Sequence, residues 1–441
     1  MESPAALDVL TPTTLLLSAA DPPALDRATE ALAQWMSAAC ASGSAACAWP
    51  LPEVAAALRA RLGSLPHRRA VHVQSWQDAL AALRDKSRHA SAAVVDGEPR
   101  LIVSLPGQGT LRPGVLARLL GQAPAWAAHL GRLSRLAADV SGFDGMAWLG
   151  DARADPDLVL KDNGRTQLAI FCVGVSLARW LSDLGLRPHG YVGHSLGEWM
   201  GATLAGVLSE ADAVLAVHHR GRLMQATGPG AALIVRQAAE ILAAKLPADV
   251  TLACVNAPNL CLVSGRPEAV ARCAETLAAE KVITRPAPIH VAVHSPVMDA
   301  VIEPFRRELS AVAFSPPRVP LLSAVTGAWM SPDLASDPDY WATQLRKTVR
   351  FDKAAETLLA APCTVLFEVG MGSALTSLAG SRIKDRARQR AFALFGRDEP
   401  GPEGYDIGRP LQALGELWAS GVAIDLVGDM PLTRPPPDLP G

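Results

Sequence analysis

The chain has 441 residues, of which 49% are hydrophobic and 19% are charged. This composition is typical of a globular protein and excludes intrinsic disorder for most of the chain, because disorder accompanies low hydrophobicity and high net charge. The formal net charge is −2, which disfavours a general nucleic-acid binder, since such proteins are normally basic.

The cysteines and the N-terminus indicate a cytoplasmic protein. The seven cysteines are dispersed without a CxxC pair, so we expect neither a zinc site nor a disulfide framework. The apolar run Leu15–Leu17 is far too short for a signal sequence or a membrane span. We therefore expect no metal, no membrane and no nucleic acid among the binding partners.

Four segments are expected along the chain, distinguished by the spacing of their apolar residues. Two of them, 98–228 and 294–398, belong together as a larger α/β unit, because strands alternate with helices and this order predicts a mainly parallel sheet. Residues 229–293 are inserted into that unit. Residues 1–97 predict a small α/β domain before it, and residues 399–441 predict a linker with a Pro-rich end after it.

The expected elements follow in chain order. The first domain has strands expected at 11–16 and 70–73, and helices at 22–36, 52–62 and 76–86. The larger unit has strands expected at 101–105, 191–193, 319–323 and 365–369, and helices at 166–184 and 198–208. The inserted unit has the β-α-β-β-α-β order of a ferredoxin-like fold, with strands expected at 231–235, 250–255, 260–264 and 282–286, and helices at 238–245 and 267–280.

The sharpest motif is Gly193-His194-Ser195-Leu196-Gly197, which follows a predicted strand and precedes a predicted helix. This is the context of a nucleophile elbow, in which small residues let the chain turn tightly and expose the serine oxygen. The helix N-terminus then presents the Leu196 N–H and a positive dipole end to a developing oxyanion. A plain strand–turn–helix connection would also explain the glycines, so the motif alone leaves both interpretations open.

A serine nucleophile needs a general base, and ten histidines are available. His294 precedes a helix rich in apolar residues, where a capped or core-edge histidine is the alternative interpretation. The side chain of His194 should diverge from the neighbouring serine hydroxyl, which makes it a poor base. An unrelated α/β-hydrolase with GxSxG would also need a carboxylate between serine and histidine, for which Asp212 and Asp249 are available.

Four stretches stand out in this order along the chain: Pro106–Gly109 (PGQG), Gly193–Glu198 (GHSLGE), His219–Gln225 (HRGRLMQ) and His294–Asp299 (HSPVMD). Together they resemble the acyltransferase domains of modular polyketide synthases, whose core is shared by malonyl-CoA:acyl-carrier-protein transacylases. The resemblance implies an α/β fold with a hydrolase-like parallel-sheet large subdomain and an inserted ferredoxin-like small subdomain. The first domain resembles the linker between ketosynthase and acyltransferase domains, and the C-terminal segment resembles the linker that follows an acyltransferase.

The resemblance implies a role for each matching catalytic residue. Ser195 would be the nucleophile and His294 the general base of a Ser–His dyad. In this family a backbone carbonyl orients the histidine in place of a carboxylate, and Gln344 is the candidate. The backbone N–H groups of Gln108 and Leu196 would form the oxyanion hole.

The resemblance also implies how a substrate is held. Arg220 would bind the free carboxylate of a malonyl-type acyl unit, because a planar guanidinium grips a carboxylate with two hydrogen bonds. Without the surrounding match, the same arginine would be interpreted as solvated on a helix face. Further residues expected near the substrate are His194, Asn256, Val293 and Trp199.

The residues that sort acyl units in this family give mixed signals. Malonyl-selecting domains have His-Ala-Phe-His before the helix and methylmalonyl-selecting ones have Tyr-Ala-Ser-His, whereas Val291–His294 (VAVH) fits neither. Val293 is smaller than Phe, which favours an α-substituent, but Leu196 replaces the Gln typical of methylmalonyl-selecting domains. Trp199 is bulky enough to close such a pocket again. The sequence leaves the acyl unit open.

We therefore expect an acyltransferase of polyketide biosynthesis. It would move a malonyl-type acyl unit from CoA to the phosphopantetheine of an acyl carrier protein, by a ping-pong mechanism through an acyl-Ser195 intermediate and without a bound cofactor. The flanking segments imply a ketosynthase or a larger polyketide synthase module as a further partner. An editing hydrolase of stalled acyl carrier proteins is the main alternative, although such relatives tend to lose the arginine, and a non-catalytic docking module is a second.

Overall fold

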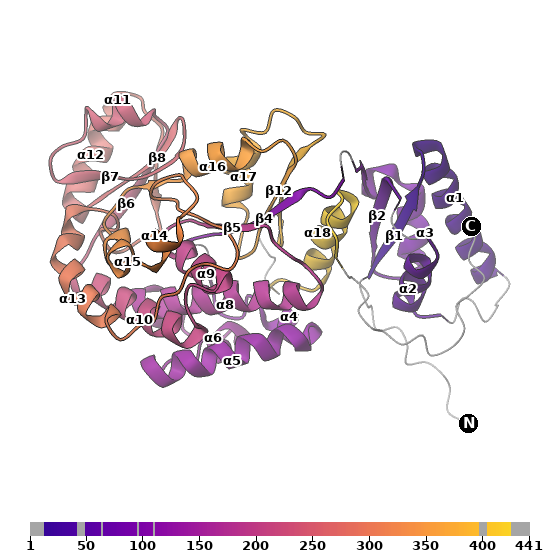
Figure 1. Cartoon of the computed structure of the whole chain (residues 1–441), viewed down its shortest axis with the longest axis horizontal. Coiled ribbons are helices and arrows are strands. Elements are labelled where there is room, and N and C mark those ends of the chain that lie inside the picture. The colour runs from indigo at the N-terminus through magenta and orange to yellow at the C-terminus, as the bar shows by residue number, and fades with distance from the viewer. Residues whose placement is uncertain are drawn as a thin grey trace.

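A computed structural model describes residues 13–41, 49–62, 65–94, 97–108, 111–396 and 404–424. The described chain forms three sheets with helices packed against them (Figure 1). Three features discussed above lie outside the described residues: the start of the first expected strand, Gly109 of the PGQG stretch, and the Pro-rich tail.

The N-terminal unit is an antiparallel sheet in the order β1-β2-β3 with three helices against it (Figure 1). Its elements are β1 (Thr13–Ala19), α1 (Pro22–Ala41), α2 (Leu51–Leu62), β2 (His67–Val73), α3 (Trp76–Arg84), the short helix η1 (Lys86–Arg88) and β3 (His89–Ala93). Leu15, Leu17, Val71 and Val73 are buried in its core with apolar helix residues. Strand β3 was not predicted, because its sequence HASAA has none of the β-branched or large aromatic residues that favour strands.

The larger unit is built on a parallel sheet in the order β10-β5-β4-β12-β13, which confirms the predicted α/β class. Its strands are β4 (Arg100–Leu105), β5 (Gly190–Gly193), β10 (Leu321–Leu322), β12 (Thr364–Glu368) and β13 (Gln389–Ala393). Leu105 pairs with Gly193, so the carboxyl ends of β4 and β5 lie side by side. The predicted elbow around Ser195 begins at this edge, directly after β5.

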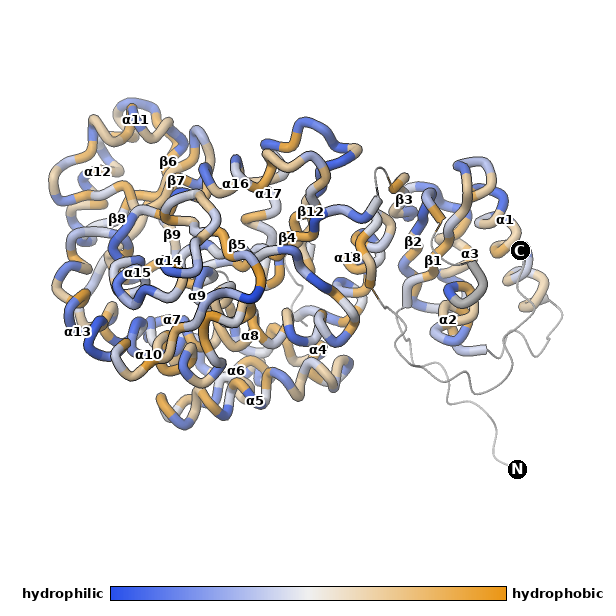
Figure 2. The backbone as a smooth tube through the Cα atoms, in the orientation of Figure 1, coloured by the Kyte–Doolittle hydropathy of each residue, from blue (hydrophilic) through white to orange (hydrophobic). Residues whose placement is uncertain are grey.

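Helices pack around this sheet and on one another. They are α4 (Ala117–Gln122), α5 (Pro124–Ser141), α6 (Gly145–Gly150), α7 (Asp157–Leu160), α8 (Asn163–Asp183), α9 (Leu196–Ala205), α10 (Glu210–Ala226), η2 (Pro296–Met298), α13 (Asp299–Leu309), α14 (Pro332–Ser336), α15 (Pro338–Gln344), α16 (Phe351–Leu359) and α17 (Ala374–Gly380). Helix α8 is almost wholly buried, whereas α13 on the outside carries many hydrophilic residues (Figure 2). Among the described helices, none is long and apolar enough to cross a membrane.

The inserted unit has the predicted ferredoxin-like order. Its elements are β6 (Ala231–Val235), α11 (Ala239–Ala243), β7 (Val250–Ala257), β8 (Leu260–Gly265), α12 (Pro267–Ala279) and β9 (Thr284–Ala287). The four strands pair antiparallel in the order β7-β8-β6-β9. A fifth strand that was not predicted, β11 (Val349–Arg350), adds to β7 in parallel and belongs to the larger unit. This pairing ties the small sheet to the turn that precedes β11, where one site residue lies.

Helix α18 (Gly408–Ala419) belongs to the C-terminal segment but packs on the N-terminal sheet (Figure 1). Arg68 of β2 donates to the carbonyl of Trp418 at 3.1 Å, and its guanidinium lies over the same residue's ring. Gly415 makes the closest approach: a Cβ there would lie 2.8 Å from Thr14 Cγ2 and 3.0 Å from Ala70 Cβ. The last described helix of the chain thus packs directly against the first strands of the chain.

A Gly415→Ala variant is expected to lower the free energy of unfolding by about 1–2 kcal/mol, because the added methyl group overpacks this contact. Gly121 in α4 is the matched control, since no atom lies within 4 Å of a Cβ built there. Gly121→Ala should stabilise the protein by up to about 1 kcal/mol through helix propensity. Urea denaturation of both variants measures the difference, and equal shifts would contradict the close packing of α18 on the sheet.

Candidate active site

Ser195 stands at a sharp turn between β5 and α9. Its φ is 54° and its ψ is −110°, a strained conformation that costs about 1–3 kcal/mol and persists only where the surroundings hold it. A Cβ on Gly193 would lie 2.0 Å from the carbonyl carbon of Gly197, and one on Gly197 would lie 1.9 Å from the Leu105 oxygen. Close packing of the turn on itself and on β4 therefore explains both glycines, and the turn carries the nucleophile that the motif predicts.

Ser195 and His294 come together although 99 positions separate them in the chain. Ser195 Oγ lies 2.8 Å from His294 Nε2, and His294 Nδ1 lies 2.8 Å from the carbonyl oxygen of Lys347. Because a carbonyl oxygen can only accept, Nδ1 carries the proton and Nε2 keeps the lone pair that accepts from the serine hydroxyl. This is the tautomer that a general base needs.

The orienting carbonyl is that of Lys347, so the prediction of Gln344 in this role was wrong. Gln344 ends α15, whereas Lys347 lies in the turn between that helix and β11. The Gln344 carbonyl also raises the pKa of His294, but less than the Lys347 carbonyl does. The side chain of Gln344 does something else: its amide donates to the Ser195 carbonyl at 2.8 Å. A sequence match locates the segment, but which carbonyl faces the ring depends on how the chain leaves the helix.

His294 is electrostatically disposed to stay neutral. Burial first, and then the charges of Arg220 and His194, lower its pKa to about 3, against the Lys347 carbonyl, which raises it. The pKa of nearby Glu198 is shifted upward instead, because burial raises it to about 7. A neutral imidazole hydrogen-bonded to a serine can take up the hydroxyl proton across the physiological range.

The shifted pKa values predict how stability depends on pH. The unfolded chain protonates His294 near its ordinary pKa of 6.5 and the folded chain only near about 3, so this contribution is present above pH 6.5 and is lost as the pH falls toward 3. Glu198 acts with opposite sign, since its raised pKa adds stability below its ordinary 4.5 that is lost as the pH rises through about 7. The wild-type curve therefore mixes both groups.

A His294→Gln variant separates the two contributions. Between about pH 6.5 and pH 5 it should lose about 1.5 kcal/mol less unfolding free energy than the wild type, since one pKa unit corresponds to about 1.4 kcal/mol. Urea denaturation of both proteins at the two pH values measures this difference. Parallel losses in the two proteins would show that His294 is not held neutral by its surroundings.

Arg220 is a buried cation that forms no ion pair with a described carboxylate. Its side chain is 2% exposed. Nη1 donates to Gln167 Oε1 at 2.6 Å, Nη2 donates to Ser195 Oγ at 3.4 Å, and Nε has no partner among the described residues. Burial lowers the pKa of Arg220 to about 10, while the charge of Glu198 opposes this shift. The guanidinium remains charged at neutral pH, and it keeps unused hydrogen-bonding capacity next to the nucleophile.

Gln167 was missed by the sequence analysis. It lies on α8, is almost fully buried, and accepts from Arg220. The contact depends on a close helix crossing: a Cβ on Gly221 would lie 2.6 Å from Gly164 Cα, so α10 approaches α8 at two glycines. A glutamine directly before the apolar run 168–175 of this helix was the available signal, because a buried polar side chain needs a partner.

The two predicted oxyanion-hole residues flank the elbow. Leu196 is the first residue of α9, where the N–H groups have no partner within the helix. Gln108 follows Gly107, and a Cβ on Gly107 would lie 2.6 Å from the His194 carbonyl oxygen, so this loop passes directly over the elbow. Within the described part of the chain, neither N–H donates to another residue. Their role toward an oxyanion stays a prediction.

His194 and Asn256 form a pair of their own. His194 Nε2 lies 2.8 Å from Asn256 Oδ1, and burial lowers the pKa of this histidine. As expected, the ring turns away from the serine hydroxyl. Asn256 on β7 thus fixes the residue before the nucleophile and connects the small sheet to the elbow, and contact of either residue with a substrate stays a prediction.

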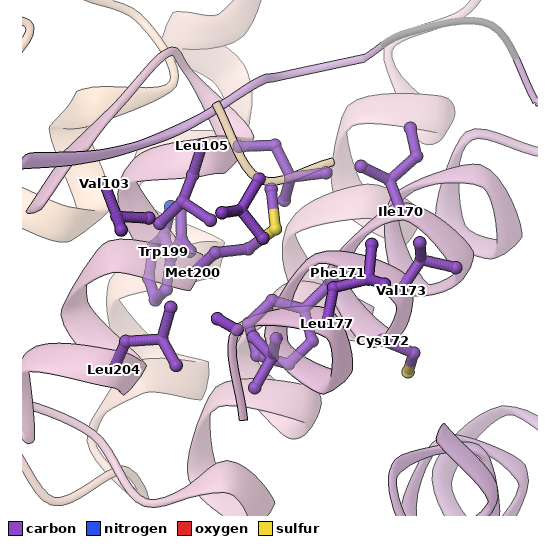
Figure 3. Close-up of a cluster of buried hydrophobic side chains, with 14 of the residues drawn as sticks. Val103, Leu105, Ile170, Phe171, Cys172, Val173, Leu177, Trp199, Met200 and Leu204 are labelled. Carbon is purple, nitrogen blue, oxygen red and sulfur yellow. The ribbon is translucent and has the colours of Figure 1, made fainter. Parts of the chain in front are cut away.

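Trp199 is buried in the hydrophobic core, which does not fit the expectation that it closes an acyl pocket. Its side chain is fully buried, and its ring centroid lies 5.8 Å from that of Phe305 and 4.9 Å from that of Trp341. Figure 3 shows it within the hydrophobic core beside Met200. Helix α9 turns this position toward α13 and α15. Val293 is buried directly before His294, and its contact with an acyl group stays a prediction.

An α/β-hydrolase triad is not formed by the two candidate carboxylates. Asp212 lies at the start of α10, where its carboxylate accepts from the Ser209 hydroxyl, and Asp249 pairs with Arg272 at 2.6 Å. Neither bonds to His294, whose Nδ1 is occupied by the Lys347 carbonyl. A dyad with a backbone carbonyl in the third position is the arrangement present.

Comparison with known proteins identifies relatives of this geometry. One subunit of the phenolphthiocerol/phthiocerol polyketide synthase of Mycobacterium tuberculosis is 34% identical over 342 residues, which cover 78% of this chain and 23% of that subunit. The polyketide synthase GfsB of Streptomyces halstedii is 33% identical over 392 residues, covering 85% of this chain and 7% of the synthase. The chain thus spans less than a quarter of the length of these curated relatives.

Solved structures of acyltransferase domains are similar to this chain as well. The acyl transferase domain of SpnD in complex with 2-(pent-4-yn-1-yl)malonyl has a TM-score of 0.84 and 31% identity, covering 95% of this chain and 97% of that domain. The acyltransferase domain from module 8 of the salinomycin polyketide synthase has a TM-score of 0.82 and 27% identity over 94% of this chain and 97% of that one. The family model described as acyl transferase domain matches residues 104–413. The chain belongs to the acyl transferase domain family and resembles its polyketide synthase members.

Proposed function

We propose that this chain transfers a carboxylated, malonyl-type acyl unit from CoA to the phosphopantetheine of an acyl carrier protein. The observation that supports this most is Arg220, a buried guanidinium without a carboxylate partner among the described residues, 3.4 Å from Ser195 Oγ. Burying a charge is costly unless it is paired. A substrate carboxylate would supply the missing partner with a bidentate hydrogen bond, and an uncharged acyl group would not.

The first half-reaction acylates Ser195. As its oxygen attacks the thioester carbonyl carbon, its proton passes to His294 Nε2, which lies 2.8 Å away. The N–H groups of Gln108 and Leu196 hold the oxyanion of the tetrahedral intermediate. The carbon–sulfur bond then breaks, and His294 returns the proton to the sulfur of CoA. The products are acyl-Ser195 and free CoA.

The second half-reaction reverses these roles. His294 takes the proton of the phosphopantetheine thiol, and the thiolate attacks the acyl-serine ester at the same carbonyl carbon. Collapse of the intermediate breaks the carbon–oxygen bond and returns the proton to Ser195 Oγ. Since one active site serves both thiols in turn, the kinetics should be ping-pong.

The partners beyond the carrier protein belong to the same proposal. The chain matches only a fraction of polyketide synthase subunits, and α18 joins the N-terminal sheet into a flanking unit separate from the dyad. We infer that a ketosynthase or polyketide synthase module is the further partner, in the cytoplasm.

Transfer to a thiol distinguishes this function from the editing hydrolase. The chain is incubated with malonyl-CoA and a holo acyl carrier protein, and the amount of malonylated carrier protein is compared with that of free malonate by mass spectrometry. Transfer predicts the malonylated carrier protein as the main product. Release of malonate without any malonylated carrier protein would support the hydrolase instead.

A further inference from the structure

Glu198 is a fully buried carboxylate at the start of α9, three residues after the nucleophile. Oε1 accepts from the Tyr340 hydroxyl at 2.6 Å and from the Ala324 N–H at 3.2 Å. Oε2 accepts from Gln344 Nε2 at 3.0 Å. Two other ionisable groups interact with this carboxylate. The hydrogen bond from Tyr340 lowers the pKa of Glu198, and the charge of Glu198 raises the pKa of Arg220. Glu198 is thus an acceptor at both oxygens.

Gln344 uses its two amide hydrogens on two different acceptors. One goes to Glu198 Oε2 and the other to the backbone carbonyl of Ser195, at 2.8 Å. Its own oxygen, Oε1, is buried without a partner among the described residues. Flipping the amide would place that oxygen against two acceptors, so the hydrogen bonds fix the orientation with both hydrogens used. Glu198 therefore holds Gln344 in the orientation that binds Ser195.

The Ser195 carbonyl matters because of the peptide group it belongs to. The carbonyl of Ser195 and the N–H of Leu196 are parts of one planar trans unit and point in opposite directions. An anchor on the carbonyl therefore also sets the direction of the Leu196 N–H. Glu198 N–H donates to the same carbonyl at 3.1 Å, so two donors restrain a backbone turn that is strained at φ 54°.

We propose that Glu198 and Gln344 are positioning residues that aim the Leu196 N–H at the oxyanion by clamping the Ser195 carbonyl from behind. The proposal rests on the proposed function, because it requires an oxyanion at Ser195. It assigns a catalytic consequence to two buried side chains that touch neither substrate nor the reacting atoms. Their loss should lower the rate of the chemical step and leave substrate binding in place.

The proton inventory predicts what Glu198→Gln does. Ser323 Oγ accepts from two N–H groups, of Val325 and Thr326, and so must give its one proton to Tyr340. Tyr340 then points its own proton at Glu198. A glutamine at 198 has two orientations. Its NH₂ group faces either the Tyr340 hydroxyl and the Ala324 N–H or the Gln344 amide, and in both cases it meets a hydrogen-bond donor. Facing Gln344, it would displace that amide from the Ser195 carbonyl.

The test measures kcat and KM for transfer of the acyl unit by the full chain, from malonyl-CoA to a holo acyl carrier protein. Gln344→Met keeps the volume and removes both donors. We expect kcat to fall at least tenfold, with KM within threefold of wild type, because small misplacements of catalytic groups can cost about 10²-fold. Glu198→Gln should behave alike. Since both act through one carbonyl, the double variant should lose little more than Gln344→Met alone.

Two controls separate positioning from stability. Gln389→Met removes a buried amide that also donates to two carbonyls, those of Leu359 and Ala361, at the opposite end of the sheet. Glu368→Gln alters another fully buried glutamate. Both should lower the unfolding temperature with kcat near wild type. Failure of the wild type to be acylated would refute the proposed function itself. Normal wild-type acylation with unchanged kcat in Gln344→Met, or with additive losses in the double variant, would overturn the positioning role alone.

Discussion

A Ser195→Ala variant should form no acyl-enzyme and should transfer acyl groups at least about 10⁴-fold more slowly than the wild type, the usual scale for losing a nucleophile. The physical reason is that no other described hydroxyl lies within hydrogen-bond distance of His294 Nε2. Intact-protein mass spectrometry and the rate of carrier-protein loading measure the two effects. The fold should persist, since the variant removes one oxygen atom.

Ser209→Ala provides the control for that substitution. Ser209 caps α10 by accepting from the Asp212 N–H at 3.0 Å, on the exposed surface. Losing such a cap costs about 1 kcal/mol of stability, but acylation should stay within twofold of wild type. Acyl-enzyme formation by Ser195→Ala at the wild-type rate would place the nucleophile elsewhere.

An Arg220→Ala variant should lose about 10²-fold or more in kcat/KM for malonyl-CoA, since each hydrogen bond to a charged group contributes about 1.5–3 kcal/mol and two are lost. Acetyl-CoA has no carboxylate to lose, so its kcat/KM should change far less. The ratio between the two substrates therefore isolates the carboxylate contact from any general damage. Initial rates with both substrates give this ratio.

Arg222→Ala is the matched control, two residues along the same helix. Arg222 is exposed and pairs with Glu308 at 3.1 Å on the surface, where an ion pair contributes little. Both kcat/KM values should stay within threefold of wild type. If Arg220→Ala left the malonyl-to-acetyl ratio unchanged, the carboxylate would be bound by another group.

The catalytic residues were predictable because their chemistry is local or their motif is long. Ser195 needs two glycines within two positions, and packing against β4 explains both of them. His294 and Arg220 stand in stretches that resemble a family, and the fold brings each within hydrogen-bonding reach of Ser195. The ferredoxin-like order was readable from apolar spacing, since each of its elements is regular enough to show a period.

The site residues and elements that were not predicted depend on contacts between segments far apart in the sequence. Lys347 orients His294 because of how the chain turns after α15, and Gln167 meets Arg220 because two helices cross at glycines. Trp199 was misplaced because bulk beside a motif says nothing about which face of the helix meets the core. Strand β11 has two residues, too few for any period. Pairing with β7 defines it, and a single sequence does not show pairing.

The central claim is that Ser195 accepts a carboxylated acyl unit from CoA. Intact-protein mass spectrometry tests it most directly, after incubation of the chain with malonyl-, methylmalonyl-, ethylmalonyl- and acetyl-CoA in parallel. We predict a mass gain on Ser195 equal to one carboxylated acyl group, with little or no acetyl adduct, and the best substrate in the panel would identify the acyl unit. An acetyl adduct alone, or no adduct from any carboxylated CoA, would contradict the account.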